Sequence, residues 1–308
     1  MFSFLSKRRK PGWMALRMQG GELALAHVLR RSDSRPEVRV CECYVLDDGE
    51  ASALQRLRSR LCAHACTLLM PDGEYLLTML DAPAVPREER KEALRWSLAD
   101  LVSYPIDSAC IDILDIPEAA VPSGRQAGVM VVSAAEAAVR ARIAPFEKAG
   151  VELQVIDIPE LAQRNVATLF EEENRGLAFL RLDEYGMMLT LSFQGELIAV
   201  RRSEMNSRQI NEGDASTRER LVLEVQRSLD NFDRQYSQIP IAQLLVACHP
   251  VMEDLLAELG EASYVPVRTL DLAQVMDLSA VPELADPAFQ ARNLLVLGAA
   301  LRSVGESA

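Results

Sequence analysis

The stretch ALRMQGG at residues 15–21 decides the fold when it is set beside FLRLDEYG at residues 179–186. In each stretch a short apolar run around an arginine, Arg17 in the first and Arg181 in the second, leads into a turn and then into a second strand-like run. Glycine is the residue that a tight hairpin turn requires, because its backbone adopts positive φ without a steric cost. The sequence therefore predicts two β-hairpins, each of which opens one half of the chain.

Segments with helical and strand-like patterns alternate outward from these hairpins. The turn PDG at 71–73 separates the apolar runs 66–70 and 75–80 and predicts a further hairpin in the first half. The polar stretch 203–217 indicates a mobile loop. Strands that alternate with helices are typical of an α/β protein. Apolar residues at helical spacing predict helices at 52–61, 87–102, 134–149, 159–170, 218–236, 251–259 and 288–301.

Charge and composition argue against several classes of function. The 308 residues carry a formal net charge of −12, whereas phosphate contacts need clustered Lys and Arg, so we expect no nucleic-acid binding. No apolar run approaches the roughly 18 residues that a membrane helix needs. The close cysteine spacings, Cys41 with Cys43 and Cys62 with Cys66, do not match those of zinc sites, so we expect no metal.

Residues 1–12 form a basic tail, in which an apolar start precedes the run Lys7, Arg8, Arg9 and Lys10. That order is the reverse of a secretory signal, so we expect the chain to stay in the cytoplasm. An apolar segment followed by cations is suited to rest on anionic lipid or on a membrane-embedded partner. A solvated terminus is the alternative interpretation.

A smaller block interrupts the first half of the chain. Pro83 and Pro86 mark its start, and the apolar stripe of its helix includes Leu98 and Leu101. Trp96 on the same helix is predicted to be a core residue. The organisation we expect is a tail at 1–12, a first lobe at 13–80, an inserted subdomain at 81–154, a return to the first lobe at 155–175, a second lobe at 176–286, and a C-terminal helix at 287–303 that packs on the first lobe.

Several short segments occur in an order that matches a known family. They are ALRW at 93–96, YPI at 104–106, ID at 111–112, AGV at 149–151, VIDIPE at 155–160, GEL at 195–197, LEVQRSLD at 223–230 and LGAAL at 297–301. With the two hairpins, they resemble the PilM family of type IV pilus assembly proteins, within the actin, hexokinase and Hsp70 superfamily, and most closely the MshI proteins of the MSHA pilus. The resemblance implies a two-lobed actin-like ATPase (ribonuclease H-like) fold with a small inserted subdomain.

The resemblance also implies a nucleotide site between the hairpins, from which this chain departs. ATP-binding members clamp phosphates between Gly- or Ser-rich turns, here Gly20-Gly21 and 183–186, and hold Mg²⁺ with an aspartate near the end of each first strand. The matching positions here are Arg17 and Arg181, and a guanidinium cannot ligate Mg²⁺. In the second lobe, CHP at 248–250 replaces a glycine pair of the superfamily. We therefore expect a pseudo-ATPase without a cofactor, and binding of ATP with Mg²⁺ is the alternative.

Two roles stay open for Arg17 and Arg181. In the first role, each arginine pairs with an acid across the interlobe cleft, such as Asp183 or Asp157, because buried arginines almost always need a partner. Alternatively the two arginines, beside Gly20 and Gly21, hold a nucleotide or another anion directly, since guanidinium forks suit phosphate and carboxylate.

By the same resemblance, a groove between the subdomain and the first lobe takes the short cytoplasmic N-terminal tail of a bitopic inner-membrane partner of the PilN type. The residues expected to line this groove are Arg95, Ser97, Asp100 and Tyr104. The chain is then a cytoplasmic scaffold of a type IV, MSHA-type pilus assembly machine, peripheral to the inner membrane. The alternative is an ATP-binding regulatory protein that cycles between open and closed lobes.

Overall fold

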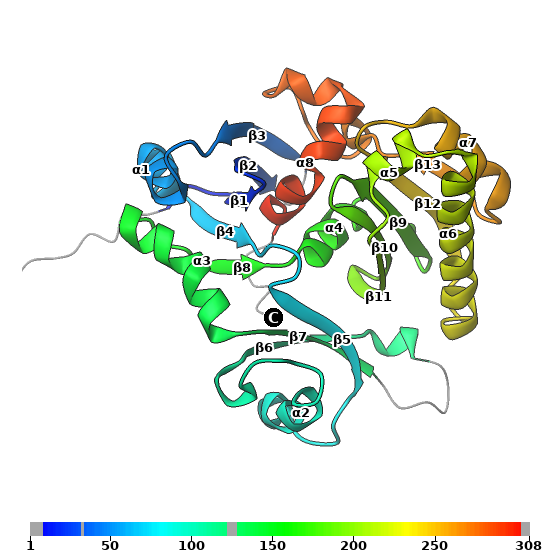
Figure 1. Ribbon diagram of the computed structural model, residues 1–308, viewed down its shortest axis with the longest axis horizontal. Coiled ribbons are helices and arrows are strands. Elements are labelled where there is room, and N and C mark those ends of the chain that lie inside the picture. Colours follow the sequence, from blue (N-terminus) through cyan, green and yellow to red (C-terminus); the bar gives the residue numbers. More distant parts are fainter. Residues whose placement is uncertain (1–8, 32–33, 122–127, 303–308) are drawn as a thin grey trace, which may run out of the picture.

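Two lobes and a smaller subdomain make up the structure (Figure 1). The computed structural model describes residues 9–31, 34–121 and 128–302. Within these ranges the strands form two five-stranded sheets and one three-stranded sheet. Helices separate the strands of each lobe along the chain, so the predicted α/β class is confirmed.

Lobe 1 holds the first predicted hairpin. Its elements are β1 Trp13–Gln19, β2 Glu22–Arg31, β3 Ser34–Val45, α1 Glu50–Leu61, β4 Ala65–Leu69, α3 Glu136–Ala149 and β8 Val155–Asp157. The sheet order is β3-β2-β1-β4-β8, with β2 antiparallel and β4 parallel to β1. Neighbours along a strand point to opposite faces. Met14 and Leu16 therefore lie in one core with Leu54 of α1 and Phe146 of α3, whereas Ala15 faces the other side of the sheet.

Lobe 2 repeats this plan. Its elements are β9 Gly176–Asp183, β10 Gly186–Phe193, β11 Glu196–Ser203, α5 Ser207–Glu212, α6 Ala215–Gln235, β12 Ile241–Cys248, α7 Glu253–Ala262 and β13 Val267–Thr269. The sheet order is β11-β10-β9-β12-β13, with β10 antiparallel and β12 parallel to β9. Helix α6 begins after Asp214, whose carboxylate accepts a hydrogen bond from the Thr217 N–H, and its apolar stripe packs on the sheet. The repeat predicted from the two hairpins is therefore a repeat of sheet topology.

Two helices fill the space between the lobes, α4 Pro159–Ala167 and α8 Pro287–Ala300 (Figure 1). One hydrophobic core joins Leu294 and Leu297 of α8 to Ala15 of lobe 1 and Phe179 of lobe 2. The helices approach so closely at Gly298 that a side chain there would collide with the backbone oxygen of Ala162. Glycine is needed at this contact, because no other residue leaves the backbones free to touch.

The subdomain is a three-stranded antiparallel sheet of order β5-β7-β6, covered by α2 (Figure 1). Leu94 and Leu98 of α2 form its core with Val129 and Val131 of β7. Its strands and helix are β5 Tyr75–Asp81, α2 Arg90–Leu98, β6 Cys110–Asp115 and β7 Gly128–Ala134. Single 3₁₀ turns lie at Arg87–Glu89, Ile106–Ser108 and Glu118–Ala120 here, and at Leu272–Gln274 and Pro282–Ala285 before α8.

The structure corrects four local predictions. The runs 66–70 and 75–80 do not form a hairpin, because β4 pairs with β1 and β8 while β5 pairs with β7 of the subdomain. The helix predicted at 87–102 is shorter, and Leu101 beyond its end is 51% exposed. Trp96 is 81% exposed rather than a core residue. The stretch 203–217 contains α5, which Asn206 and Gln209 cap at its start.

None of the helices in the described ranges is long and apolar enough to span a membrane.

Candidate functional site

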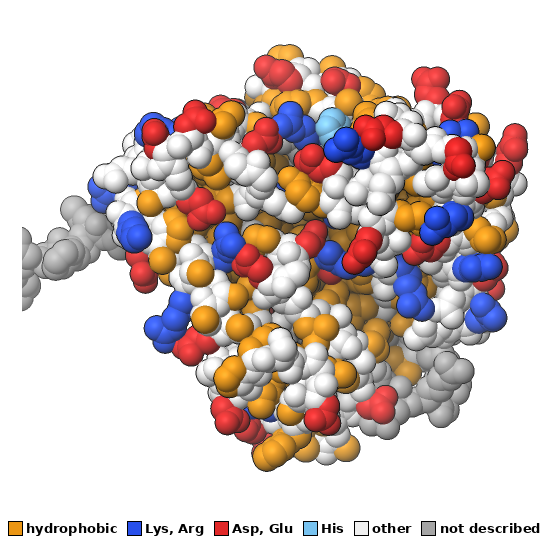
Figure 2. Space-filling model, in the orientation of Figure 1, with side chains coloured by type: hydrophobic (Ala, Val, Ile, Leu, Met, Phe, Trp, Pro, Cys, Tyr) orange, Lys and Arg blue, Asp and Glu red, His pale blue; other side chains and the backbone are white. Residues whose placement is uncertain are grey.

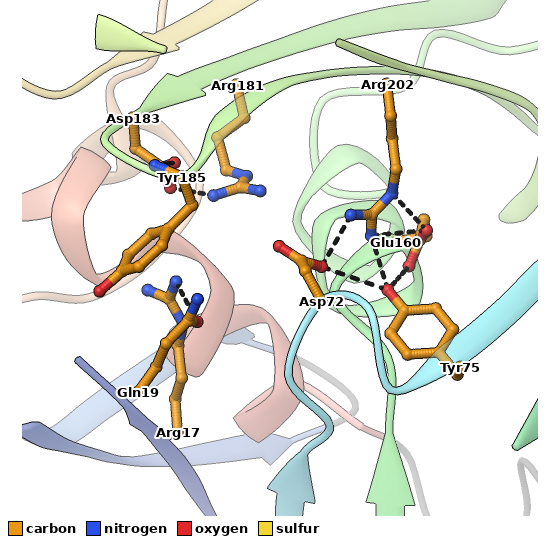
Figure 3. A network of polar contacts seen from close by, with 9 residues as sticks. All are labelled: Arg17, Gln19, Asp72, Tyr75, Glu160, Arg181, Asp183, Tyr185 and Arg202. Carbon is orange, nitrogen blue, oxygen red and sulfur yellow. Dashed lines mark hydrogen bonds and ion pairs between the residues drawn. The ribbon is translucent and has the colours of Figure 1, made fainter. Parts of the chain in front are cut away.

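The turns of the two hairpins meet between the lobes (Figure 3). Gly20, in the β1–β2 turn, has a φ of +62°, and a Cβ atom there would lie 2.7 Å from the hydroxyl oxygen of Tyr185 in the β9–β10 turn. Gly21 beside it, with a φ of +78°, faces open space. A left-handed backbone and a close neighbour together favour glycine at position 20. The side chain of Tyr185 therefore packs against the turn of the opposite lobe.

Arg17 reaches this contact from β1. Its Nε and Nη2 atoms donate hydrogen bonds of 3.1 and 2.7 Å to the side-chain oxygen of Gln19, and its guanidinium carbon lies 4.9 Å from the ring centroid of Tyr185. Burial and then the positive charge of Arg181 lower the pKa of Arg17, while Asp183 raises it. Arg17 thus has a neutral partner in its own strand and a cation–π contact with the other lobe.

Arg181 lies on β9 and is 3% exposed. Its Nη1 atom forms an ion pair with the carboxylate of Asp183, which also accepts a 2.9 Å hydrogen bond from the Tyr185 N–H. Its Nε atom has no hydrogen-bond partner among the described residues. The expected pairing across the cleft is therefore wrong, because Asp183 belongs to the same hairpin as Arg181. The other expected partner, Asp157, accepts instead a 3.3 Å hydrogen bond from Arg302.

The two guanidinium groups point into the space between the lobes from opposite sides (Figure 3). A guanidinium donates hydrogen bonds and stays charged, so it can attract an anion but cannot ligate a metal ion. After β12, the His249 N–H donates a 2.9 Å hydrogen bond to the Leu182 oxygen at the end of β9. In the described ranges, no cluster of His, Cys, Asp and Glu is suited to hold a metal ion.

A second polar network joins all three parts of the molecule at Arg202 of β11 (Figure 3). Its guanidinium donates to Glu160 of α4 at 2.9 Å, to Asp72 after β4 at 2.7 Å, and to the Tyr75 hydroxyl of β5 at 2.6 Å. The Tyr75 hydroxyl in turn donates to Glu160 at 2.7 Å, and Glu160 is 1% exposed. Burial lowers the pKa of Arg202, but Glu160, Tyr75 and Asp72 outweigh this and raise it above its ordinary value. Arg202 therefore neutralises a buried glutamate.

A groove of about 490 Å³ adjoins this network, between β5, β11 and α6. It is lined by the consecutive residues 75–79 of β5 and 199–202 of β11, with Phe232 and Tyr236 of α6. Since neighbours along a strand point to opposite faces, a run of consecutive lining residues places the groove at the strand edges. Both strands are the outermost strands of their sheets, so the groove runs between two open sheet edges. We call it the strand-edge groove.

The residues predicted to hold a partner lie on the subdomain, and the strand-edge groove is lined by others. Arg95 donates to the backbone oxygen of Ile106 at 2.7 Å and so fixes the chain after α2. Tyr104 donates to the buried Ser133 hydroxyl at 2.9 Å. Ser97 and Asp100 are exposed.

The basic tail is only partly described, because Lys7 and Arg8 lie outside the described residues. Arg9 forms an ion pair of 2.5 Å with Glu152, and the Lys10 N–H donates to the Ala63 oxygen at 2.7 Å. The end of the basic run is thus attached to lobe 1.

The sequence interpretation missed the Arg202 network and the strand-edge groove. The signal present was the charged pair Arg201-Arg202 directly after the apolar run 197–200, together with Glu160 near the start of the predicted helix 159–170. A buried carboxylate needs a cation, but the local pattern does not say which one.

No model of a known protein family matches the sequence, and no curated protein matches it. Among solved structures, a chain of the PilM-PilN type IV pilus biogenesis complex superposes with a TM-score of 0.74 at 18% identity, over 96% of this chain and 100% of that chain. The cytoplasmic domain of EpsL, an inner-membrane component of the type II secretion system of Vibrio cholerae, gives a TM-score of 0.51 at 14% identity, over 95% and 96% of the two chains.

The chain has an actin-like ATPase fold. The likeness to the PilM-PilN structure covers both lobes and the subdomain, and it agrees with the repeated sheet topology. The PilM-like fold predicted from the sequence is therefore confirmed.

Proposed function

We propose that this protein is a scaffold of a type IV pilus assembly machine, which binds an extended segment of an inner-membrane partner and does not hydrolyse ATP. The observation that carries the proposal is the strand-edge groove, where two sheets present open edges to one space. The likeness of nearly the whole chain to a chain of the PilM-PilN complex supports the choice of machine.

The strand-edge groove has the properties of a peptide site. An extended segment that enters it can satisfy its backbone on a strand edge, while its side chains enter pockets on alternate sides. Leu77, Met79 and Val200 offer apolar contacts along the groove, and Phe232 and Tyr236 close it on the α6 side. Backbone pairing provides affinity that is independent of sequence, and these apolar side chains select the partner.

The partner that we propose is a PilN-like bitopic protein, whose short cytoplasmic N-terminal tail occupies the groove. This assignment places the chain in the cytoplasm, peripheral to the inner membrane. The resemblance of the sequence to MshI further points to an MSHA-type pilus.

The proposed loss of hydrolysis follows from the arginines between the lobes. Arg17 and Arg181 stand where the resemblance expects Mg²⁺-binding aspartates, and Tyr185 seats against the turn at Gly20. Two cations at a metal site oppose Mg²⁺ binding, because like charges repel at short distance.

Isothermal titration with a synthetic peptide of the PilN-like partner's cytoplasmic tail tests the proposal. Met79→Glu places a charge in the groove and is expected to weaken binding at least about tenfold, which corresponds to about 1.4 kcal/mol. Leu101→Glu is the matched control, since Leu101 is an exposed apolar residue of the same subdomain near Ser97 and Asp100. We expect it to leave the Kd unchanged.

Melting curves of both variants verify that they are folded. A weakened Kd in Leu101→Glu with an unchanged Kd in Met79→Glu would move the site to the face predicted from the sequence. Failure of the wild-type protein to bind the peptide would contradict the proposed partner.

A further inference from the structure

A second hollow continues the strand-edge groove along the outer face of α6, with Arg201, Arg202 and Asn231 lining both. Its cationic lining residues are Arg201, Arg202, Arg220, Arg227 and Arg234, and its one acidic lining residue is Glu224. Figure 2 shows basic side chains gathered over α6 on the right of the molecule. We call this surface the α6 arginine face.

Most of these charges are not neutralised by the protein. Arg202 belongs to the network with Glu160, but the side chains of Arg201, Arg220 and Arg227 form no hydrogen bond or ion pair with other described residues. Arg234 donates to the backbone oxygen of Asp230, which is uncharged. A cluster of unpaired cations in a chain of net charge −12 creates a local positive potential that attracts an anionic partner.

The face also has an apolar centre. Leu223 lies between Arg220 and Arg227 along α6 and is 44% exposed, and Met205 lines the same hollow. An apolar residue ringed by cations suits a partner that carries both acidic and apolar side chains. A phosphate chain or a lipid headgroup offers only the charge.

The spacing of the arginines matches an extended chain. Arg220, Arg227 and Arg234 follow one another at intervals of seven residues, which keeps them on one side of the helix at steps of about 10 Å. A peptide in the extended polyproline II conformation rises about 3.1 Å per residue and turns once in about three residues, so every third side chain points to the same side and meets the next arginine. The whole row spans about 21 Å, the length of roughly seven residues in this conformation.

We propose that the α6 arginine face docks an extended acidic segment of a partner protein, with carboxylates opposite Arg220, Arg227 and Arg234 and an apolar side chain on Leu223. The narrow width of the row favours a peptide over a bilayer or a nucleic acid, because Asp230 and Asp233 flank it on α6 and repel a broad polyanion. The three α6 arginines lie outside the strand-edge groove, so substitutions of them test this docking separately from the binding of the pilus partner.

Selection from a displayed library of random dodecapeptides on the full chain tests this docking. Peptides enriched on the wild-type protein are expected to contain more Asp and Glu than the library does. These peptides should not be enriched when the selection is carried out on the double variant Arg220→Glu/Arg227→Glu. Arg268→Glu is the control, because Arg268 is exposed on β13, at the edge of the lobe 2 sheet opposite to β11. This variant should still bind the selected peptides.

One enriched peptide is then titrated by fluorescence anisotropy. Arg227→Glu is expected to raise its Kd at least about fivefold, and Arg268→Glu less than about twofold. Raising the salt concentration should weaken binding to the wild type. Enriched peptides without excess acid, or an equal Kd in both variants, would overturn the proposal. Tighter Arg227-dependent binding to phosphatidylserine vesicles or to a single-stranded DNA oligonucleotide would overturn the choice of a peptide.

Discussion

The hairpins that open the two lobes share one sequence pattern but hold their arginines in different ways. Arg181 of lobe 2 is buried and forms an ion pair with Asp183, two residues further along the same hairpin. Arg17 of lobe 1 has only the neutral Gln19 in its own strand and rests against Tyr185 of the other lobe. The charge of lobe 2 is thus neutralised locally, whereas the charge of lobe 1 is not.

Because of this difference, Arg181 contributes to the stability of one lobe, whereas Arg17 contributes to the contact between the two lobes. Loss of the Arg181 partner leaves a buried charge uncompensated and destabilises lobe 2 itself. Loss of the Arg17 contact removes one interaction between lobes and leaves each lobe intact. The effects of substitutions at the two turns on stability should therefore differ in size, and four predictions test that expectation.

The largest effect is expected at Asp183. Asp183→Ala leaves the guanidinium of Arg181 buried without an anion, and it should lower the free energy of unfolding by about 3–5 kcal/mol. Urea denaturation measures the change. The double variant Arg181→Met/Asp183→Leu removes both charges and should recover more than half of the loss. No recovery in the double variant would show that the pair acts through packing rather than charge.

The next effect separates two adjacent glycines. Gly20→Ala and Gly21→Ala both place a side chain at positive φ, which costs about 1–2 kcal/mol. Only Gly20→Ala also meets the Tyr185 hydroxyl, so it should be the more destabilising of the two. Gly20→Ala/Tyr185→Phe removes that hydroxyl and should bring the loss down to the Gly21→Ala value. Equal losses in both single variants would mean that the turns do not touch in solution.

A smaller effect is expected from the contact between Arg17 and Tyr185. A double-mutant cycle with Arg17→Met and Tyr185→Leu should give a coupling free energy of about 0.5–1 kcal/mol, the range for a partly exposed cation–π pair. The same cycle with Arg181→Met in place of Arg17→Met should give a smaller coupling. If the two cycles agree, the comparison between the hairpins does not hold.

The smallest effect, none at all, is expected from nucleotide. Binding of ATP with Mg²⁺ at about 100 times its Kd would add about 2.7 kcal/mol of stability and raise the Tm by several degrees. Differential scanning fluorimetry at millimolar ATP should show no shift. A shift without hydrolysis would indicate that the arginines bind the phosphates directly, and Arg17→Asp should then reduce the shift.

The sequence predicts those parts of the structure that depend on local signals. The hairpins at Gly20 and Gly186 follow from turn glycines beside alternating strands. The sequence also predicts Asp183 as a partner for the arginines, but across the cleft, whereas Asp183 pairs with Arg181 of its own hairpin. The PDG turn at 71–73 carries an equally strong local signal but misled the pairing of β5, because its partner β7 lies some fifty residues away. The prediction that Trp96 is buried was wrong for a related reason, since no neighbouring element covers that side of α2 in the described ranges.

The candidate sites depend even more on distant contacts. The Arg202 network joins residues from β11, α4 and the segment around β5, so no window of sequence contains it. The strand-edge groove exists because two outer strands of separate sheets come together. By contrast, the seven-residue spacing of arginines on α6 is visible in the sequence, and only their lack of ion-pair partners requires the structure.

The position of α8 has a consequence for how the chain is made. During synthesis the strands of lobe 1 leave the ribosome first, yet one face of their sheet packs against α8, which is made after both sheets. The apolar surface around Ala15 and Ala26 therefore stays open while lobe 2 is translated. Exposed apolar surface of this kind binds chaperones and aggregates. A ribosome-bound chain that stops after lobe 1 should thus be protease-sensitive, and protection should come only once α8 has emerged.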